Sequence, residues 1–247
     1  MKTKSLLISL LALIQTTNAH YTFAHLIVND TITPKWKYVR DVAGDPKYAS
    51  AGEYAKTAPF KDIYSANMIC GRESGSGPKT SVATVIAGSE LGFRIATDIG
   101  GNADAVITHE GPGQVYMSKA PNDDVEHYDG KGDWFKIAAQ AQFNDTTYLL
   151  YGEKEMRFLL PESTPPGKYL LRIEQFQPSD QLGESQWYVN CAQIDVRGPG
   201  GANPPTGFVR FPGGYDMFDT GIWITQAQQN HQKLMDYYPP GPDIWYG

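Results

Sequence analysis

Apolar and polar positions alternate in short runs along the middle of the chain, and clusters of Gly, Pro, Asp and Asn separate these runs. This pattern is typical of β-strands. The predicted strands cover residues 80–86, 91–95, 104–108, 114–118, 155–160, 168–176 and 187–196. Several short strands with regular turn signals indicate an all-β fold, either an antiparallel sandwich or a barrel.

Helical periodicity is limited to short segments such as residues 134–142, and the chain shows no internal repeat. Residues 198–206 are rich in Gly and Pro and resemble a linker. Too little chain follows this stretch for a second domain. We therefore expect residues 207–247 to be a long C-terminal segment that packs back on the strands of a single domain over residues 20–247.

The first 19 residues have the features of a secretory signal peptide. Two lysines precede an apolar run over residues 5–14, which is shorter than the ~20 residues needed to cross a bilayer. Small residues before the predicted cleavage site favour a cut after Ala19, and no later stretch reads as a membrane helix. We expect a soluble, secreted, extracellular protein that begins at His20. An N-terminal histidine can chelate a metal through its α-amine and its ring Nδ1.

Charge and cysteine content narrow the possible partners and the compartment. The net charge of −6 argues against nucleic acid and against an anionic membrane surface, because binding either one needs a basic face. The only two cysteines are Cys70 and Cys191. In an oxidising compartment an even pair predicts one disulfide, and two buried free thiols are the alternative.

Two further places could carry chemistry. His109 follows a predicted strand in a loop, from which an imidazole can reach a site. In the last predicted strand, the period of two puts Gln186 and Tyr188 on one face and residues 187, 189 and 191 on the other. One face could thus serve a polar site while the other packs the core and forms the disulfide. Each feature alone also fits a solvated surface.

Several short motifs follow one another in a specific order and spacing. They are His20-Tyr21-Thr22-Phe23, residues 62–70, His109-Glu110-Gly111-Pro112, residues 114–121, residues 134–137, residues 166–172, the Gln-x-Tyr-x-x-Cys strand at 186–191, residues 211–213 and residues 240–242. Together they resemble the fungal lytic polysaccharide monooxygenases of auxiliary activity family nine, formerly a glycoside hydrolase family. The resemblance covers essentially the whole mature chain, and Cys70–Cys191 matches the family disulfide.

The resemblance implies an immunoglobulin-like β-sandwich with a flat face that carries one copper ion. It implies that His20 binds copper through its amine and Nδ1 and that His109 binds through Nε2, an arrangement called a histidine brace. Tyr188 would lie axial to the metal, and Gln186 would help to orient the reactive oxygen species. Imidazole and amine nitrogens suit copper, and few protein ligands leave positions open for an oxygen co-substrate.

The chain departs from the family pattern at two positions near the expected site. Ser179 occupies the place where the family usually has a histidine, and Gln175 occupies a place where many relatives carry another. No histidine lies between His127 and His231. A serine hydroxyl does not titrate near neutral pH as an imidazole does. The substitution therefore bears on oxidative turnover rather than on copper binding.

Exposed features of the chain give further expectations. Tyr237 or Tyr238 could stack on a glucan chain, because sugar rings present apolar C–H surfaces to an aromatic face. Residues 225–230 stand where many relatives show tyrosines. Asn29 and Asn144 begin glycosylation sequons.

The expected function is oxidative cleavage of a β-1,4-glucan such as cellulose at C1 or C4. It would require copper, an external electron donor and dioxygen or peroxide, with the protein acting as a monomer. The alternative is a copper- or wall-binding protein of the same fold with little oxidative activity, which the serine at position 179 motivates. A hydrolase with paired carboxylates is a third reading, but no acid/base pair stands out among the 27 acidic residues.

Overall fold

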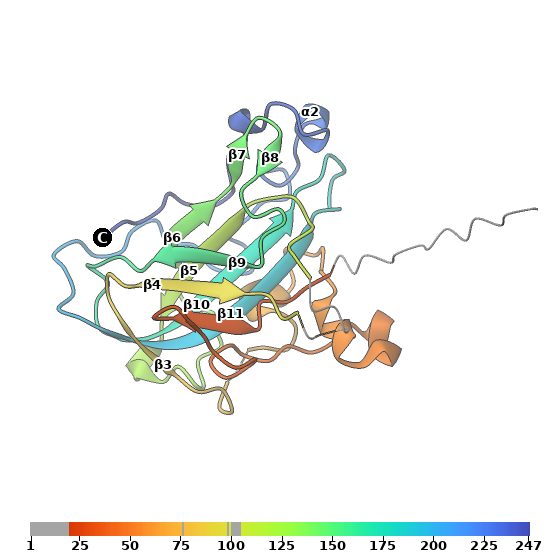
Figure 1. Ribbon diagram of the computed structural model, residues 1–247. Coiled ribbons are helices and arrows are strands. Elements are labelled where there is room, and N and C mark those ends of the chain that lie inside the picture. Colours follow the sequence, from red (N-terminus) through yellow and green to blue (C-terminus); the bar gives the residue numbers. More distant parts are fainter. Residues whose placement is uncertain (1–19, 76, 98, 100–104) are drawn as a thin grey trace, which may run out of the picture.

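Two β-sheets face each other in the computed structural model, which describes residues 20–75, 77–97, 99 and 105–247 (Figure 1). The predicted signal peptide over residues 1–19 lies outside these described residues. The smaller sheet has the strand order β2-β1-β4-β9. Its strands are β1 (His25–Val28), β2 (Thr31–Ile32), β4 (Glu90–Arg94) and β9 (Glu155–Leu159).

The larger sheet has five strands in the order β3-β11-β10-β5-β6. They are β3 (Ala83–Ile86), β5 (Gly113–Lys119), β6 (Phe135–Gln140), β10 (Gly167–Gln177) and β11 (Gln186–Arg197). Its pairs are antiparallel except for β3 and β11, which run parallel. The predicted all-β sandwich is confirmed, and this one pair is the exception to its antiparallel character. Strands so far apart in sequence can pair in parallel because a long connection separates them.

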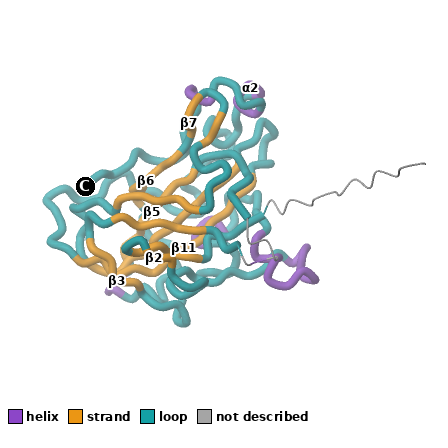
Figure 2. Tube along the Cα trace, viewed as in Figure 1, coloured by secondary structure: helices purple, strands orange, loops and turns teal. Residues whose placement is uncertain are grey.

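The helical segments are short and lie in the connections between strands (Figure 2), and one of them packs on the outer face of the larger sheet. The helical segments are η1 (Pro46–Thr57), α1 (Asn67–Cys70), η3 (Pro121–Asp123), α2 (Gln226–Gln229) and η4 (Leu234–Asp236). The hairpin of β7 (Gln142–Asn144) and β8 (Thr147–Tyr148) lies beside α2 in Figure 1, and the amide of Leu234 donates to the carbonyl of Asp145. Within the described ranges, no helix is long and apolar enough to cross a bilayer.

Apolar side chains fill the space between the two sheets. The contributing residues include Leu26, Leu91, Phe93, Met156 and Phe158 from the smaller sheet and Val115, Met117, Leu171, Ile173 and Ile194 from the larger one. Each group recurs at every second position of its strand, which is the spacing that puts side chains on one face. This layer is the main core, and the sheets hold it from both sides as in an immunoglobulin-like sandwich.

The outer face of the larger sheet is also buried, because the C-terminal segment packs along it. A second apolar cluster lies there, with Trp134, Phe176, Trp187, Phe211, Tyr215 and Ile222 among its members. Trp134 and Val209 exchange backbone hydrogen bonds of 2.8 and 2.9 Å, which fixes the segment to the edge beside β6. The expectation that residues 207–247 return to the sandwich is confirmed.

Two of the predicted segments have a different structure. Residues 105–108 form no strand, although Ile107 pairs with the turn at residues 152–153 through two backbone hydrogen bonds. The helix that the weak period indicates over residues 134–142 is absent, since β6 covers most of this segment. Hydrogen bonding to β5 along its length outweighs the local preference of residues such as Ala138 and Ala139 for a helix.

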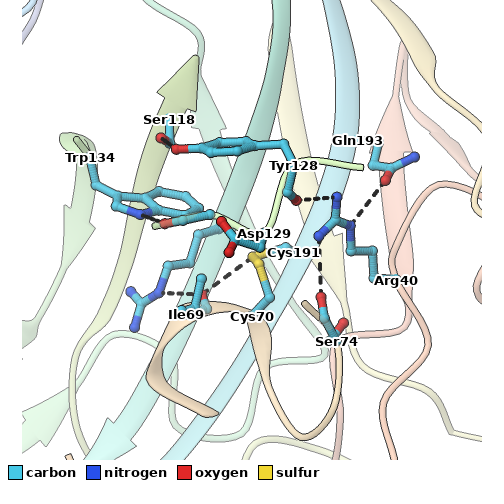
Figure 3. Close-up of a disulfide and its surroundings, with 12 residues drawn as sticks. Arg40, Ile69, Cys70, Ser74, Ser118, Tyr128, Asp129, Trp134, Cys191 and Gln193 are labelled. Carbon is cyan, nitrogen blue, oxygen red and sulfur yellow. Dashed lines mark hydrogen bonds between the residues drawn. A yellow bond between two sulfur atoms is a disulfide. The ribbon is translucent and has the colours of Figure 1, made fainter. Parts of the chain in front are cut away.

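The predicted disulfide between Cys70 and Cys191 is present and joins the end of α1 to β11. Both cysteines are buried. Figure 3 shows the buried Arg40 beside the disulfide, where its guanidinium donates to the carbonyls of Ser74 and Tyr128 and to the side chain of Gln193. The bond thus ties a loop-borne helix to the longest strand of the sheet.

Candidate metal centre

The two histidines that the sequence singles out come together at one end of the larger sheet. His20 precedes β1, and His109 lies in the loop just before β5. Their ring centroids are 5.8 Å apart, with the ring planes inclined by 60°. His20 is also close to two rings of η1, with centroid distances of 6.4 Å to Tyr48 and 6.3 Å to Tyr54. The imidazoles are near enough to bind one ion between them.

Tyr188 of β11 lies against His109. Its ring meets that of His109 edge-on at 5.2 Å, and it stacks on the ring of Tyr21 at 4.2 Å. Its hydroxyl is buried and has no hydrogen-bond partner among the described residues. A buried hydroxyl without a partner is costly, and it fits a site that is completed by a bound group. A buried phenol thus packs against one of the two imidazoles.

Gln186, the first residue of β11, faces the same space. Its side-chain oxygen lies 3.1 Å from Nε2 of His109, and its NH₂ group donates to the side-chain oxygen of Gln177 at 3.4 Å. The predicted alternation in β11 is confirmed, because residues 187, 189 and 191 belong to the cluster on the opposite face of the sheet. The sheet therefore brings Gln186 and Tyr188 to the histidines.

Burial determines the charge state of both imidazoles. Desolvation lowers the pKa of His20 below 6.5. Desolvation also lowers the pKa of His109, with a smaller effect in the same direction from the nearby His20, while the hydrogen bond to Gln186 acts against it. Lowered pKa values favour the neutral form of both rings, which is the form that binds a metal. In His109, a metal at Nε2 would replace the proton that this atom donates to Gln186.

A metal ion between His20 and His109 needs a further ligand atom that the side chains of the described residues do not provide. Among those residues, no group of three or more His, Cys, Asp and Glu lies close enough to hold an ion. The α-amine of His20, which exists once the chain is cut after Ala19, would be the third nitrogen. Two imidazoles, an amine and a phenol form a donor set that suits copper.

A buried glutamine, Gln175 of β10, connects the two segments that carry the histidines. Its NH₂ group donates to the backbone carbonyl of His109 at 2.8 Å, and its oxygen accepts a hydrogen bond from the hydroxyl of Tyr21. One side chain thus positions both the loop of His109 and the residue after His20. Sequence reasoning had noted Gln175 only as a departure from the family, and no local pattern signals this role.

A second unforeseen contact joins the site to the C-terminal segment. Nε2 of His231 contacts the carboxylate of Glu110, the residue after His109. The two remaining histidines have ordinary structural places. Nδ1 of His25 contacts the carbonyl of Thr33 at 2.8 Å, and His127 is an exposed loop residue beside Asp124.

The two tyrosines expected to stack on a substrate differ in their exposure. Tyr237 is only 1% exposed, and its hydroxyl donates to the carbonyl of Gly221 at 2.8 Å. Its ring packs against Tyr148 in the core and offers no free face to a sugar, so this expectation is corrected. Tyr238 is 79% exposed. Asn29 and Asn144 are exposed, as the predicted glycosylation would require.

The fold and the paired imidazoles define a β-sandwich protein with a candidate metal centre at one end of its sheets. The sequence profile of Auxiliary Activity family 9 (formerly GH61) matches residues 20–237. The chain is 48% identical over 242 residues to AA9 family lytic polysaccharide monooxygenase U of Thermothielavioides terrestris, which covers 93% of each chain. It is 36% identical over 249 residues to AA9 family lytic polysaccharide monooxygenase C of Emericella nidulans, which covers 98% of each. The chain therefore belongs to Auxiliary Activity family 9.

Solved structures support the same fold. The crystal structure of HiLPMO9B superposes with a TM-score of 0.73 and 24% sequence identity, and the match covers 92% of this chain and 100% of that one.

Proposed function

We propose that this protein is a secreted, copper-dependent lytic polysaccharide monooxygenase that cleaves a β-1,4-glucan such as cellulose by oxidation at C1 or C4. The observation that carries the proposal is the packing of His20 and Tyr188 around His109, together with the unpartnered hydroxyl of Tyr188. Family membership and the names of the relatives support the reaction class. The family match begins at residue 20, which supports a mature chain that starts at His20.

Each residue of the site has a proposed role. His20 would bind copper through its α-amine and Nδ1, and His109 would bind through Nε2. A copper ion held by these residues would supply one-electron redox chemistry, with an external donor as the reductant and dioxygen or peroxide as the co-substrate, for oxidation of a C–H bond. Tyr188 would offer its hydroxyl to the metal, and its buried ring keeps water from that side of His109. Gln186 would orient the oxygen co-substrate through its amide.

The substrate would lie across this end of the sandwich. Tyr238 is the exposed ring of the predicted pair and remains a proposed contact for a glucan chain. We expect one copper ion per chain, because His20 and His109 are the one pair of imidazoles that lie together among the described residues. A monomer suffices, because one chain brings all the proposed ligands together.

A copper- or wall-binding protein with little oxidative activity is the second candidate, and Ser179 is the observation that favours it. The hydroxyl of Ser179 accepts a hydrogen bond of 3.0 Å from the backbone amide of Gln181 and shapes a turn. A hydroxyl engaged in this way supplies no titratable group. If the Ser179→His variant gains large oxidative activity over an almost inactive parent, the second candidate describes the parent better.

The direct test of the first candidate is the release of oxidised sugars from amorphous cellulose by the copper-loaded chain that begins at His20. Oxidised products that disappear with a chelator support it. Unoxidised sugars as the sole products, formed equally with a chelator present, would support a hydrolase instead.

The Tyr188→Phe variant separates a metal-binding hydroxyl from a structural one. We expect the free energy of unfolding of the copper-free protein to change by less than ~1 kcal/mol, because this buried hydroxyl has no partner to lose. The electron paramagnetic resonance spectrum of bound copper(II) should change. Tyr116→Phe is the matched control, since it removes a buried hydroxyl that bonds to Tyr215 at 2.7 Å and should cost about 1–2 kcal/mol. A copper spectrum that is identical in Tyr188→Phe and the parent would contradict a role for this hydroxyl at the metal.

A further inference from the structure

A polar groove of about 240 Å³ opens directly beside the candidate metal centre. Its lining residues are Lys61, Gln177, Pro178, Ser179, Gln181, Glu184, Gln186 and Gln229. Gln186 belongs both to this groove and to the metal centre, where its oxygen lies 3.1 Å from Nε2 of His109. A molecule in the groove would therefore lie next to the reacting position.

The groove offers amide and hydroxyl groups and no aromatic ring among its lining residues. The oxygen of Gln177 accepts from Gln186, and the oxygen of Gln229 accepts from the amide of Asp180 at 3.2 Å. Within the described part of the chain, no contact engages the NH₂ groups of these two glutamines or the side chain of Gln181. Each can donate a hydrogen bond to a hydroxyl group.

The charges of the groove are balanced. Lys61 and Glu184 are its only charged lining residues, and they form an ion pair with each other. A ligand with its own charge would have to compete with this pair. A neutral molecule rich in hydroxyl groups meets no such competition and matches the free amides.

We propose that this groove is a subsite that binds one sugar unit of a single, soluble β-1,4-glucan chain through hydrogen bonds to the edge of the ring. The inference rests on the proposed function and names its substrate class more closely. Aromatic stacking needs the flat face of a sugar, whereas amides need hydroxyl groups that are free. In crystalline cellulose, neighbouring chains occupy many of these hydroxyl groups, so the groove favours a separated chain over a crystal surface.

The test compares glutamine-to-methionine variants, because methionine matches the length of glutamine and removes its hydrogen-bonding groups. Binding of cellohexaose is measured by isothermal titration calorimetry with copper(II) present and no reductant, so that no oxidation occurs. For the double variant Gln181→Met and Gln229→Met, we expect the Kd for cellohexaose to rise roughly ten-fold or more. Adsorption to microcrystalline cellulose should stay unchanged. Gln226→Met, at an exposed glutamine of α2 outside the groove, is the control and should leave both quantities unchanged.

Two outcomes would overturn the subsite. One is equal affinity of the double variant and the parent for cellohexaose, with both folded as judged by thermal unfolding. The other is a parent that adsorbs to microcrystalline cellulose and does not bind cellohexaose. Failure of the proposed function would give a different result. The parent would form no oxidised products, and the double variant would still bind cellohexaose more weakly than the parent. That result would support the subsite and contradict the oxidation.

Discussion

A chain that keeps one extra residue in front of His20 should bind copper(II) roughly 100- to 1,000-fold more weakly than the chain that begins at His20, which is the share of one ligand in a typical site. The extra residue turns the α-amine into an amide and leaves every side chain in place. An amide nitrogen gives up its proton far less readily than an amine with a pKa of ~7.7–8. Competition titration with a copper chelator at pH 7 measures the difference.

The control for this experiment is thermal unfolding without metal. Both chains should unfold at the same temperature, because His20 is only partly buried and its backbone nitrogen lies at the start of the described domain. Equal copper affinity of the two chains would show that the amine is not a ligand and would remove the proposed brace. His109→Ala should weaken binding in the chain that begins at His20, which checks the other ligand.

Replacing both Cys70 and Cys191 by alanine should lower the free energy of unfolding by about 4–5 kcal/mol in the chain-entropy treatment of a long closed loop. The disulfide spans 121 residues, so its loss releases about half of the chain in the unfolded state. For a domain of this size the corresponding fall in Tm is roughly 10–15 °C. Guanidinium and thermal unfolding of the copper-free protein measure both quantities.

The reduced parent serves as the comparison for the double variant, since it lacks the bond and keeps the buried sulfur atoms. The free energy of unfolding of the reduced parent should fall by most of the amount expected for the double variant. The remaining difference between the two proteins measures the packing of the two cysteine side chains. A loss of less than about 1 kcal/mol in both proteins would mean that the closed loop does not limit the unfolded chain as the entropy argument requires.

The runs of apolar residues predicted the long central strands well, because both faces of these strands are buried and few of their positions need to be polar. The predicted segments 168–176 and 187–196 correspond to β10 and β11, which extend one residue further at each end. The pattern failed where pairing depends on distant chain. Residues 134–142 became an edge strand through β5, and β3 pairs in parallel with a strand more than 100 residues away.

The candidate site was predictable in its residue types but not in its supports. His20, His109, Gln186 and Tyr188 each stand in a recognisable motif, and the structure brings them together. The contacts that hold the site join segments far apart in sequence and follow no local period. The bridge from Gln175 to Tyr21 spans 154 residues.

The burial of Tyr237 also could not be predicted from the sequence. Two adjacent tyrosines in a Pro-rich tail look alike as potential sugar platforms. Which ring turns inward depends on the carbonyl of Gly221 and on the ring of Tyr148, and both belong to other parts of the fold.

The most direct test of the account is the product analysis of a correctly processed chain, with His20 at its N-terminus and one copper ion bound. This protein is incubated with amorphous cellulose, a reductant and a low concentration of peroxide, and the soluble sugars are examined by mass spectrometry. The account predicts aldonic acids or C4-ketones that vanish when a chelator removes the copper. One equivalent of bound copper with no oxidised product from any of several β-glucans would contradict it and leave a copper-binding protein on the same fold.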